Sequence, residues 1–175
     1  MRLLVLSDVH GSRERTLDIL RSEMAAPSGS HPDYLLFLGD GLRDIDELAY
    51  YGEFAALPVL SVRGNCDFFG ASDTPELREL TLGGLRTMMM HGHRYEVKAG
   101  VTRAAAFAAS KDCDLLLFGH THIPRMERFE AGETVGGLVL RKPLVLFNPG
   151  SVGHSGSFGL VTLTDAGISC VHKKL

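Results

Sequence analysis

The sequence predicts an α/β fold, with parallel strand–helix units first and an antiparallel sheet late in the chain. Short apolar runs at 3–6, 34–38, 58–62 and 114–118 are bounded by turn residues, as are strands buried on both faces of a parallel sheet. From Arg125 onward, strand candidates follow one another with only Gly- or Pro-containing turns between them. This second pattern is typical of antiparallel strands.

Local signals define the individual elements. Ser12 is expected to cap a helix over 12–24 that carries apolar residues on one face. Gly83-Gly84 predicts a two-residue hairpin turn between strands at 78–82 and 85–90. The other elements follow from the same kind of spacing; they are helices at 45–49 and 101–108, loops at 25–32 and 68–75, strands at 126–129, 138–140, 144–147, 158–164 and 168–173, and a rigid turn at 148–151.

Length and composition limit the class of protein. The 175 residues are 45% hydrophobic and 22% charged, as expected of one soluble domain spanning 1–175. A net charge of −3 provides no cationic surface for long nucleic acid. Asp8 interrupts the N-terminal apolar run too early for a signal peptide, and no run reaches membrane-spanning length. Three widely spaced cysteines without a CxxC pair argue against a disulfide framework and favour the reducing cytoplasm.

Polar residues follow three of the apolar runs. Asp8 and His10 come after the first run and point the same way, because strand side chains alternate. Asp40 follows the second run between two glycines, and Asn65 follows the third run after Gly64. The carboxyl ends of parallel strands form one edge of a sheet, where α/β proteins bind ligands. Asp and Asn are also ordinary cap and turn residues, so each has a structural explanation when taken alone.

Histidines at later strand ends extend this pattern. With the earlier residues they give seven oxygen or nitrogen donors, which suit divalent Mn, Fe, Ni, Co or Zn. Seven donors exceed the needs of one open site, whereas a bridging Asp40 would give each of two cations four protein ligands. Buried, hydrogen-bonded histidines are the structural alternative. The candidate metal ligands are Asp8, His10, Asp40, Asn65, His91, His120 and His122.

These motifs resemble those of the calcineurin-like metallophosphoesterase superfamily. They occur in the family order, as Asp8-x-His10, Gly39-Asp40, Gly64-Asn65, His91 and Gly119-His120-x-His122. The turn Asn148-Pro149-Gly150-Ser151 is typical of the compact single-domain bacterial and archaeal phosphodiesterases of this superfamily. The resemblance covers most of the chain and implies a four-layer sandwich of two β-sheets flanked by α-helices.

The resemblance also implies a dinuclear metal site. The first cation would be held by Asp8, His10, Asp40 and His122, and the second by Asp40, Asn65, His91 and His120. A hydroxide bridging the two cations would attack phosphorus in line while the cations neutralise the phosphate oxygens. Mn is the first choice of metal, with Ni, Fe, Co or Zn as alternatives. The expected substrate is a small or nucleotide-like phosphodiester; neither long nucleic acid nor a membrane is expected as a partner, and a homo-oligomer is left open.

Position 66 departs from many superfamily members, which carry histidine directly after the asparagine. Cys66 can donate a proton to the leaving oxygen but cannot provide a cation beside it. Compact phosphodiesterases that resemble this chain also have cysteine here. We therefore name Cys66 and His93 as candidate catalytic residues, with His93 as the substitute proton donor. His93 could also contact a phosphate oxygen or support its loop, and the sequence favours neither of these two roles over the other.

Other polar residues are expected around the site or at the surface. Asp67, Arg63 and Ser151 could orient the ligands, although ordinary loop hydrogen bonding explains them equally well. His154 and His172 are expected at the surface.

Two other functions compete with the phosphodiesterase. A phosphomonoesterase or protein phosphatase would bind a dianion, and no dedicated arginine clamp for a dianion is visible. A retromer subunit of eukaryotes shares this fold, has a degraded site and mainly binds partners. A scaffold has no reason to keep seven metal ligands, so their presence favours an enzyme.

Overall fold

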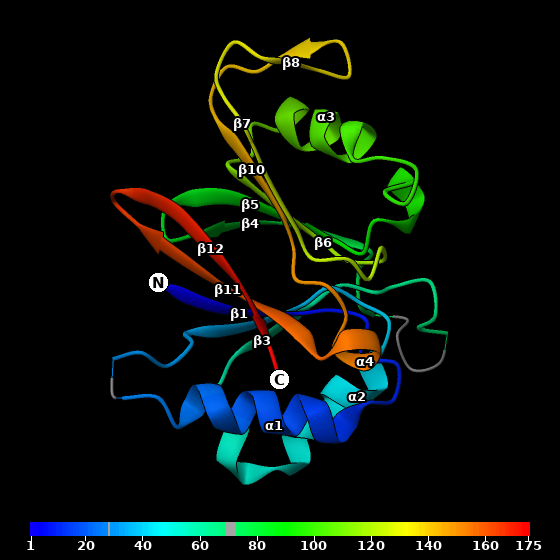
Figure 1. The fold of residues 1–175 in the computed structure, drawn as a ribbon, viewed down its shortest axis with the longest axis vertical. Helices are drawn as coiled ribbons and strands as arrows, with labels where there is room; N and C mark the ends of the chain where they lie inside the picture. Colours follow the sequence, from blue (N-terminus) through cyan, green and yellow to red (C-terminus); the bar gives the residue numbers. More distant parts are fainter. Residues whose placement is uncertain (28, 69–72) are drawn as a thin grey trace.

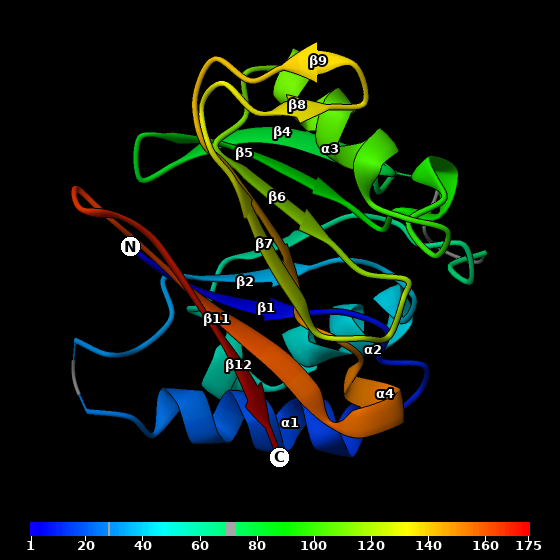
Figure 2. The same cartoon turned by 45° about the horizontal axis from the view of Figure 1, so that its top comes forward.

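The computed structural model describes residues 1–27, 29–68 and 73–175, and in this part of the chain the strands form two five-stranded sheets and a two-stranded ribbon (Figures 1 and 2). The first sheet has the order β12-β11-β1-β2-β3 and the second has the order β4-β5-β6-β10-β7. The strands of the first sheet are β1 (Arg2–Leu6), β2 (Tyr34–Phe37), β3 (Val59–Ser61), β11 (Ser157–Thr164) and β12 (Gly167–Lys174). Those of the second are β4 (Leu77–Leu82), β5 (Leu85–Met90), β6 (Leu115–Phe118), β7 (Arg125–Phe129) and β10 (Leu144–Asn148), and the ribbon is β8 (Thr134–Val135) with β9 (Leu138–Val139).

Helices cover the outer faces of both sheets. α1 (Arg13–Met24) and α2 (Leu42–Asp46) lie below the first sheet in Figure 1, and α3 (Thr102–Ser110) lies above the second. The described residues also form short 3₁₀ helices, which are η1 (Glu47–Tyr50), η2 (Gly52–Phe54) and η3 (His93–Tyr95), and a one-turn α-helix, α4 (Val152–Ser155). No helix in the described ranges is long and apolar enough to cross a membrane.

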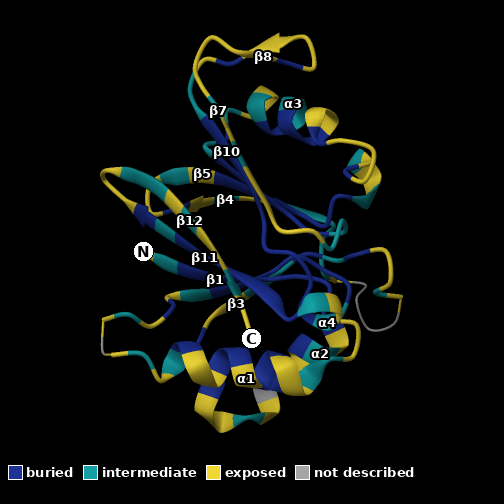
Figure 3. Cartoon of the chain, viewed as in Figure 1, coloured by how far each residue is buried: buried dark blue, intermediate teal, exposed yellow. Residues whose placement is uncertain are grey.

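Side-chain alternation along the central strands builds the layers. On β1, Leu4 and Leu6 pack toward the helices, whereas Leu3 and Val5 enter a core between the two sheets. Strand β6 divides its side chains in the same way between α3 and the intersheet core. Figure 3 shows these strands as buried between more exposed helices. The four-layer sandwich implied by the family resemblance is therefore confirmed.

Two sets of parallel strands position the site. β1, β2 and β3 run parallel in the first sheet, and β5, β6 and β10 run parallel in the second. The loops that follow these strands lie at one end of the sandwich, where the two sheets approach each other (Figure 2). The carboxyl ends of both sets therefore share one edge.

The late strands pair in antiparallel fashion, as predicted, but in the described residues they are divided between the two large sheets and the ribbon and do not form one late sheet. β10 inserts between β6 and β7, parallel to the former and antiparallel to the latter. β11 and β12 instead extend the first sheet, where β11 pairs with β1 in antiparallel fashion. Local alternation reveals that a segment is a strand, but strand order depends on long-range burial. The ribbon strand β8 has no counterpart among the predicted strands.

The local signals have mixed outcomes. The Gly83-Gly84 hairpin is confirmed, because both glycines have positive φ and Leu82 pairs with Leu85. Ser12 precedes α1, yet its side chain makes no cap hydrogen bond, and only its carbonyl accepts from Thr16. The loops predicted at 25–32 and 68–75 contain residue 28 and residues 69–72, which lie outside the described residues.

Candidate metal centre

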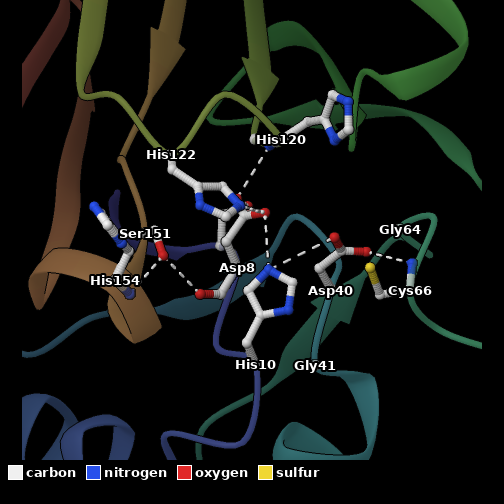
Figure 4. Close-up of polar contacts among 12 residues, drawn as sticks. Asp8, His10, Asp40, Gly41, Gly64, Cys66, His120, His122, Ser151 and His154 are labelled. Atoms are coloured by element: carbon white, nitrogen blue, oxygen red, sulfur yellow. Dashed lines mark hydrogen bonds and ion pairs between the residues drawn. The ribbon is translucent and has the colours of Figure 1, made fainter. Parts of the chain in front are cut away.

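Six candidate ligands converge where the carboxyl ends of the two sheets meet (Figure 4). Asp8, His10 and His122 form one group, and Asp40, His91 and His120 form another; within each group the ligand atoms lie within 4.8 Å of one another. These side chains follow four different strands, β1, β2, β5 and β6, and the fold brings them together. Asp8, Asp40 and His91 are buried, whereas His10 lies at the open side of the site.

Short distances hold each group together, and His10 joins the two groups. His122 Nε2 lies 3.1 Å from Asp8 Oδ1, and His91 Nε2 lies 3.3 Å from Asp40 Oδ2. His10 Nε2 is 3.7 Å from a carboxylate oxygen of each aspartate, so it stands between them (Figure 4). His120 Nδ1 approaches His91 Nε2 at 3.2 Å.

The position of Asn65 supports a role as a metal ligand less clearly than the positions of the other candidates. It follows β3, as expected, but its side chain is exposed and its amide nitrogen lies 3.2 Å from Cys66 Sγ. Its role as a ligand of the second cation therefore stays a prediction.

Several candidate ligands have left-handed backbone conformations. This conformation is uncommon for residues other than glycine and is unfavourable by roughly 1–2 kcal/mol per residue. Such strain is concentrated at functional sites, because surrounding contacts must hold it in place. The five residues are Asp8 (φ 54°), His10 (φ 47°), Asp40 (φ 61°), His120 (φ 66°) and His122 (φ 61°).

Asp8 is held on one oxygen and left open on the other. Its Oδ2 accepts from Ser7 Oγ at 2.6 Å and from His120 N at 3.0 Å. Its Oδ1 is buried and has no hydrogen-bond partner in the described residues, since His122 Nε2 is near but not aligned. Ser7 was missed at the sequence level; its signal is a hydroxyl group directly before the strand-end aspartate.

Asp67 ties two site loops together. Its Oδ2 accepts from Asp40 N and Gly64 N, both at 2.8 Å. Its Oδ1 accepts from Gly41 N at 2.8 Å and Leu42 N at 2.9 Å, at the start of α2. One carboxylate thus fixes the backbone on both sides of Asp40, in agreement with the orienting role considered for Asp67.

Glycines allow these loops to approach each other. A Cβ at Gly64 would lie 2.1 Å from Asp40 Oδ1, and a Cβ at Gly39 would lie 2.5 Å from Gly64 N. Cys66 N donates to the same Asp40 Oδ1 at 2.7 Å. The position of the Asp40 carboxylate therefore depends on the absence of a side chain at Gly64.

Comparison with known proteins identifies the family. The calcineurin-like phosphoesterase superfamily domain matches residues 1–166. The chain belongs to this superfamily. Phosphoesterases similar to it include the probable metallophosphoesterase YsnB of Bacillus subtilis, 29% identical over 168 residues that cover 93% of this chain and 85% of YsnB. The phosphodiesterase YfcE of Escherichia coli is 29% identical over 183 residues, covering 92% of this chain and 87% of YfcE.

Solved structures share the fold of this superfamily member. A predicted phosphoesterase from Streptococcus pneumoniae has a TM-score of 0.71 at 20% identity, covering 99% of this chain and 88% of that chain. A Vps29 variant from Entamoeba histolytica has a TM-score of 0.67 at 22% identity, covering 100% of this chain and 99% of that chain. The superfamily resemblance inferred from the motifs is confirmed.

Mutual contacts set the charge of the candidate metal centre. Burial alone would raise the pKa of Asp40, but the hydrogen bond and charge of His91 and the Cys66 N–H lower it below the ordinary range. Burial, together with the charge of His91, lowers the pKa of His120 to about 4. His91 Nδ1 lies 2.7 Å from Leu38 O, which orients its Nε2 toward Asp40.

This donor set fits divalent cations. Metal binding requires ionised carboxylates and neutral imidazoles. The low pKa values of Asp40 and His120 match this requirement. Burial lowers the pKa of His91, but the hydrogen bond of Asp40 and the charges of Asp8 and Asp40 raise it overall, so a bound cation would displace a proton from His91. A buried carboxylate oxygen without a hydrogen-bond partner, such as Asp8 Oδ1, is unfavourable unless a cation meets it. The residues present therefore suit the group that the family resemblance implies.

Both candidate proton donors lie beside the clusters. The Cys66 thiol falls within 4.8 Å of ligand atoms of His10 and Asp40. Burial and the nearby Asp40 raise its pKa to about 11, so the thiol keeps its proton. The His93 ring centroid lies 5.6 Å from that of His91, and its Nδ1 is buried without a hydrogen-bond partner in the described residues. Burial, and next the charge of His91, lowers the pKa of His93.

The remaining sequence candidates divide between site and surface. Ser151 Oγ donates to Asp8 O at 2.9 Å and caps α4 by accepting from His154 N. The His154 side chain is exposed, with its ring centroid 6.1 Å from that of His122 at the mouth of the site (Figure 4). Arg63 pairs with Glu76 instead of with a ligand. His172 is exposed as expected, but its ring also stacks on Phe147.

Proposed function

We propose that this phosphoesterase is a phosphodiesterase that uses two divalent cations to hydrolyse small or nucleotide-like phosphodiesters. The observation that carries the proposal is the pair of adjacent donor groups, which His10 and Asp40 join at the shared sheet edge. Family membership supports hydrolysis of a phosphate ester as the reaction class. The name of the relative YfcE and the fold shared with an archaeal phosphodiesterase favour a diester.

The chain's own residues would divide the two cations between them. Asp8, His10 and His122 would hold one cation, His91, His120 and Asn65 would hold the other, and Asp40 would contact both. Two bound divalent cations supply a nucleophile by lowering the pKa of water to about 7, and they neutralise the phosphate oxygens. Mn²⁺ is our first choice, and Ni²⁺, Fe²⁺, Co²⁺ and Zn²⁺ have similar preferences for these donors.

The surrounding residues keep the reacting groups in position. Asp67 and Ser7 fix the two aspartates, and the Leu38 carbonyl orients His91. Asp8 and Asp40 are buried while His10 and His122 are partly open, so a phosphate would approach from the histidine side. Cys66 or His93 would give a proton to the leaving oxygen, because both lie at the edge of the clusters.

Paired assays test this function. Protein stripped of metal by a chelator is given Mn²⁺ and then bis(4-nitrophenyl) phosphate or 4-nitrophenyl phosphate. We expect hydrolysis only after Mn²⁺ is added, with a higher kcat/KM for the diester. Faster hydrolysis of the monoester would indicate a phosphomonoesterase or protein phosphatase, and no hydrolysis of either would contradict an enzyme.

We also propose a cytoplasmic location. Cys66, Cys113 and Cys170 are all unpaired, as is usual in a reducing compartment. Mass spectrometry of protein that is unfolded in the presence of the thiol reagent, without a reductant, should find three labelled cysteines.

A further inference from the structure

A small cavity lies beside the second group of candidate ligands. It has a volume of about 110 Å³, enough to admit water or a small polar group. The end of β5, the start of β4 and η3 form its walls, with Glu76, His93, Arg94 and Tyr95 among the lining residues. Met90 and Gly92, which flank His91 in the chain, also line it, so the cavity adjoins the proposed reaction site.

Two arginines meet at Glu76, which lines this cavity together with Arg94. Arg94 Nη2 donates to Glu76 Oε1 at 2.9 Å, and Arg94 Nε donates to Glu76 Oε2. Arg63 Nη2 donates to the same Oε1 at 3.0 Å. Two guanidinium groups therefore share one carboxylate, which leaves the cluster with one net positive charge. Arg94 is well exposed, so it can turn toward a second partner.

His93 connects the cavity with the ligands. His93 lines the cavity, and its ring centroid lies 5.6 Å from that of His91 and 6.2 Å from that of His120. A substrate whose phosphate lies at the ligands would therefore extend past His93 into the cavity. Its Nδ1 has no hydrogen-bond partner in the described residues and is buried.

We propose that this cavity is a subsite for an anionic group, a carboxylate or a second phosphate, on one arm of the phosphodiester. Arg94 is the residue that determines this specificity, with Arg63 beside it. The inference rests on the proposed function and narrows its substrate class. Guanidinium groups bind carboxylate and phosphate through two parallel hydrogen bonds, the geometry that Arg94 already makes with Glu76. An anionic arm would take over part of that geometry, whereas a neutral arm would gain nothing from it.

The test compares two matched diesters, phenyl 4-nitrophenyl phosphate and 4-carboxyphenyl 4-nitrophenyl phosphate. Both released phenols are quantified, so binding on either side of the phosphorus is detected. We expect kcat/KM for the carboxyphenyl diester to be about tenfold higher, as expected of one added charge-assisted hydrogen bond. Arg94→Ala should reduce this ratio to near one, and Arg94→Lys should retain part of it.

The control is Arg103→Ala. Arg103 has similar exposure to Arg94 and also pairs with a glutamate, Glu96, at 3.3 Å. This variant should keep both the basal activity and the tenfold ratio. Melting temperatures of all variants check that they are folded.

The outcomes separate this inference from the proposed function. Equal kcat/KM for the two diesters, or a ratio that Arg94→Ala leaves unchanged, would overturn the subsite while the phosphodiesterase stands. Calorimetric binding of 4-carboxyphenyl methyl phosphate and phenyl methyl phosphate gives the same comparison without turnover. If no diester is hydrolysed but an Arg94-dependent binding preference is found, the subsite stands and the proposed function falls. Equal binding in that case would overturn the subsite as well.

Discussion

Gly64 is the residue at which one added methyl group would disturb the site most directly. Its hypothetical Cβ lies 2.1 Å from Asp40 Oδ1 and 2.5 Å from Asp40 N. We expect Gly64→Ala to displace the Asp40 carboxylate and to lower kcat/KM by about 10²-fold, the effect of a misplacement near 1 Å. Gly52→Ala is the control, because a Cβ at Gly52 meets nothing within 4 Å. Equal diester hydrolysis by the two variants would show that Asp40 tolerates displacement.

Cys66 allows a test of the leaving-group chemistry. Its pKa of about 11 makes the thiol a weak acid that carries no positive charge. We expect Cys66→His to raise the relative kcat/KM of diesters with poor leaving groups by about tenfold, because an imidazolium is a stronger acid. Cys66→Ser keeps a neutral donor and should leave the relative rates unchanged. If Cys66→His also leaves them unchanged, position 66 has no role in leaving-group release.

At the residue scale, ligand identity could be predicted but ligand conformation could not. Asp8, Asp40 and His120 were recognisable because each lies two positions after the end of an apolar run. Their left-handed backbone was not, because aspartate and histidine rarely adopt it and only tertiary contacts can enforce it. Ser7 and Glu76 were missed for a similar reason, since their partners are known only from the fold.

At the scale of elements, Asp67 joins the loop after β3 to the loop after β2 and the start of α2. Four backbone N–H groups donate to its carboxylate. In Asp67→Asn one oxygen becomes an NH₂ group that faces N–H donors, so two of these bonds are lost. We expect the free energy of unfolding to fall by about 2–4 kcal/mol, and metal affinity to fall by about 10–100-fold. Urea denaturation and metal titration measure the two effects.

A control for Asp67 lies at the other end of the first sheet. Asp33 Oδ2 accepts from Arg2 N at 2.6 Å, a single carboxylate-to-backbone bond remote from the strand-end loops. Asp33→Asn should reduce stability without changing metal affinity. Unchanged metal affinity in Asp67→Asn would mean that the tie between the loops is structural only.

Element types were easier to predict than their arrangement. The apolar runs before Asp8, Asp40 and Asn65 became the parallel strands β1, β2 and β3, because burial on both faces leaves a clear apolar pattern. The late strands β10 and β11 are also largely buried, so their own residues do not indicate which sheet each strand joins. Whether β10 pairs with β6, and β11 with β1, depends on which core each strand completes.

At the scale of the whole molecule, the two sheets must pack closely for their strand ends to meet. Gly159 on β11 faces Phe147 on β10, and a Cβ at Gly159 would lie 2.3 Å from the Phe147 ring. We expect Gly159→Ala to lower the free energy of unfolding by about 1–3 kcal/mol, the usual effect of overpacking. Urea denaturation measures the free energy of unfolding of Gly159→Ala and of the control variant Gly52→Ala. If Gly159→Ala is destabilised no more than the control, stability does not depend on this close contact between the sheets.

The central claim is that two cations share one carboxylate at the edge where the sheets meet. The most direct measurement is the metal content per chain, by mass spectrometry of metals after equilibration with Mn²⁺, in the wild type, His122→Ala and Asp40→Ala. We predict two Mn²⁺ per chain in the wild type, about one in His122→Ala and almost none in Asp40→Ala. Circular dichroism must show that both variants are folded. One Mn²⁺ retained by folded Asp40→Ala, or only one in the wild type, would contradict the shared site.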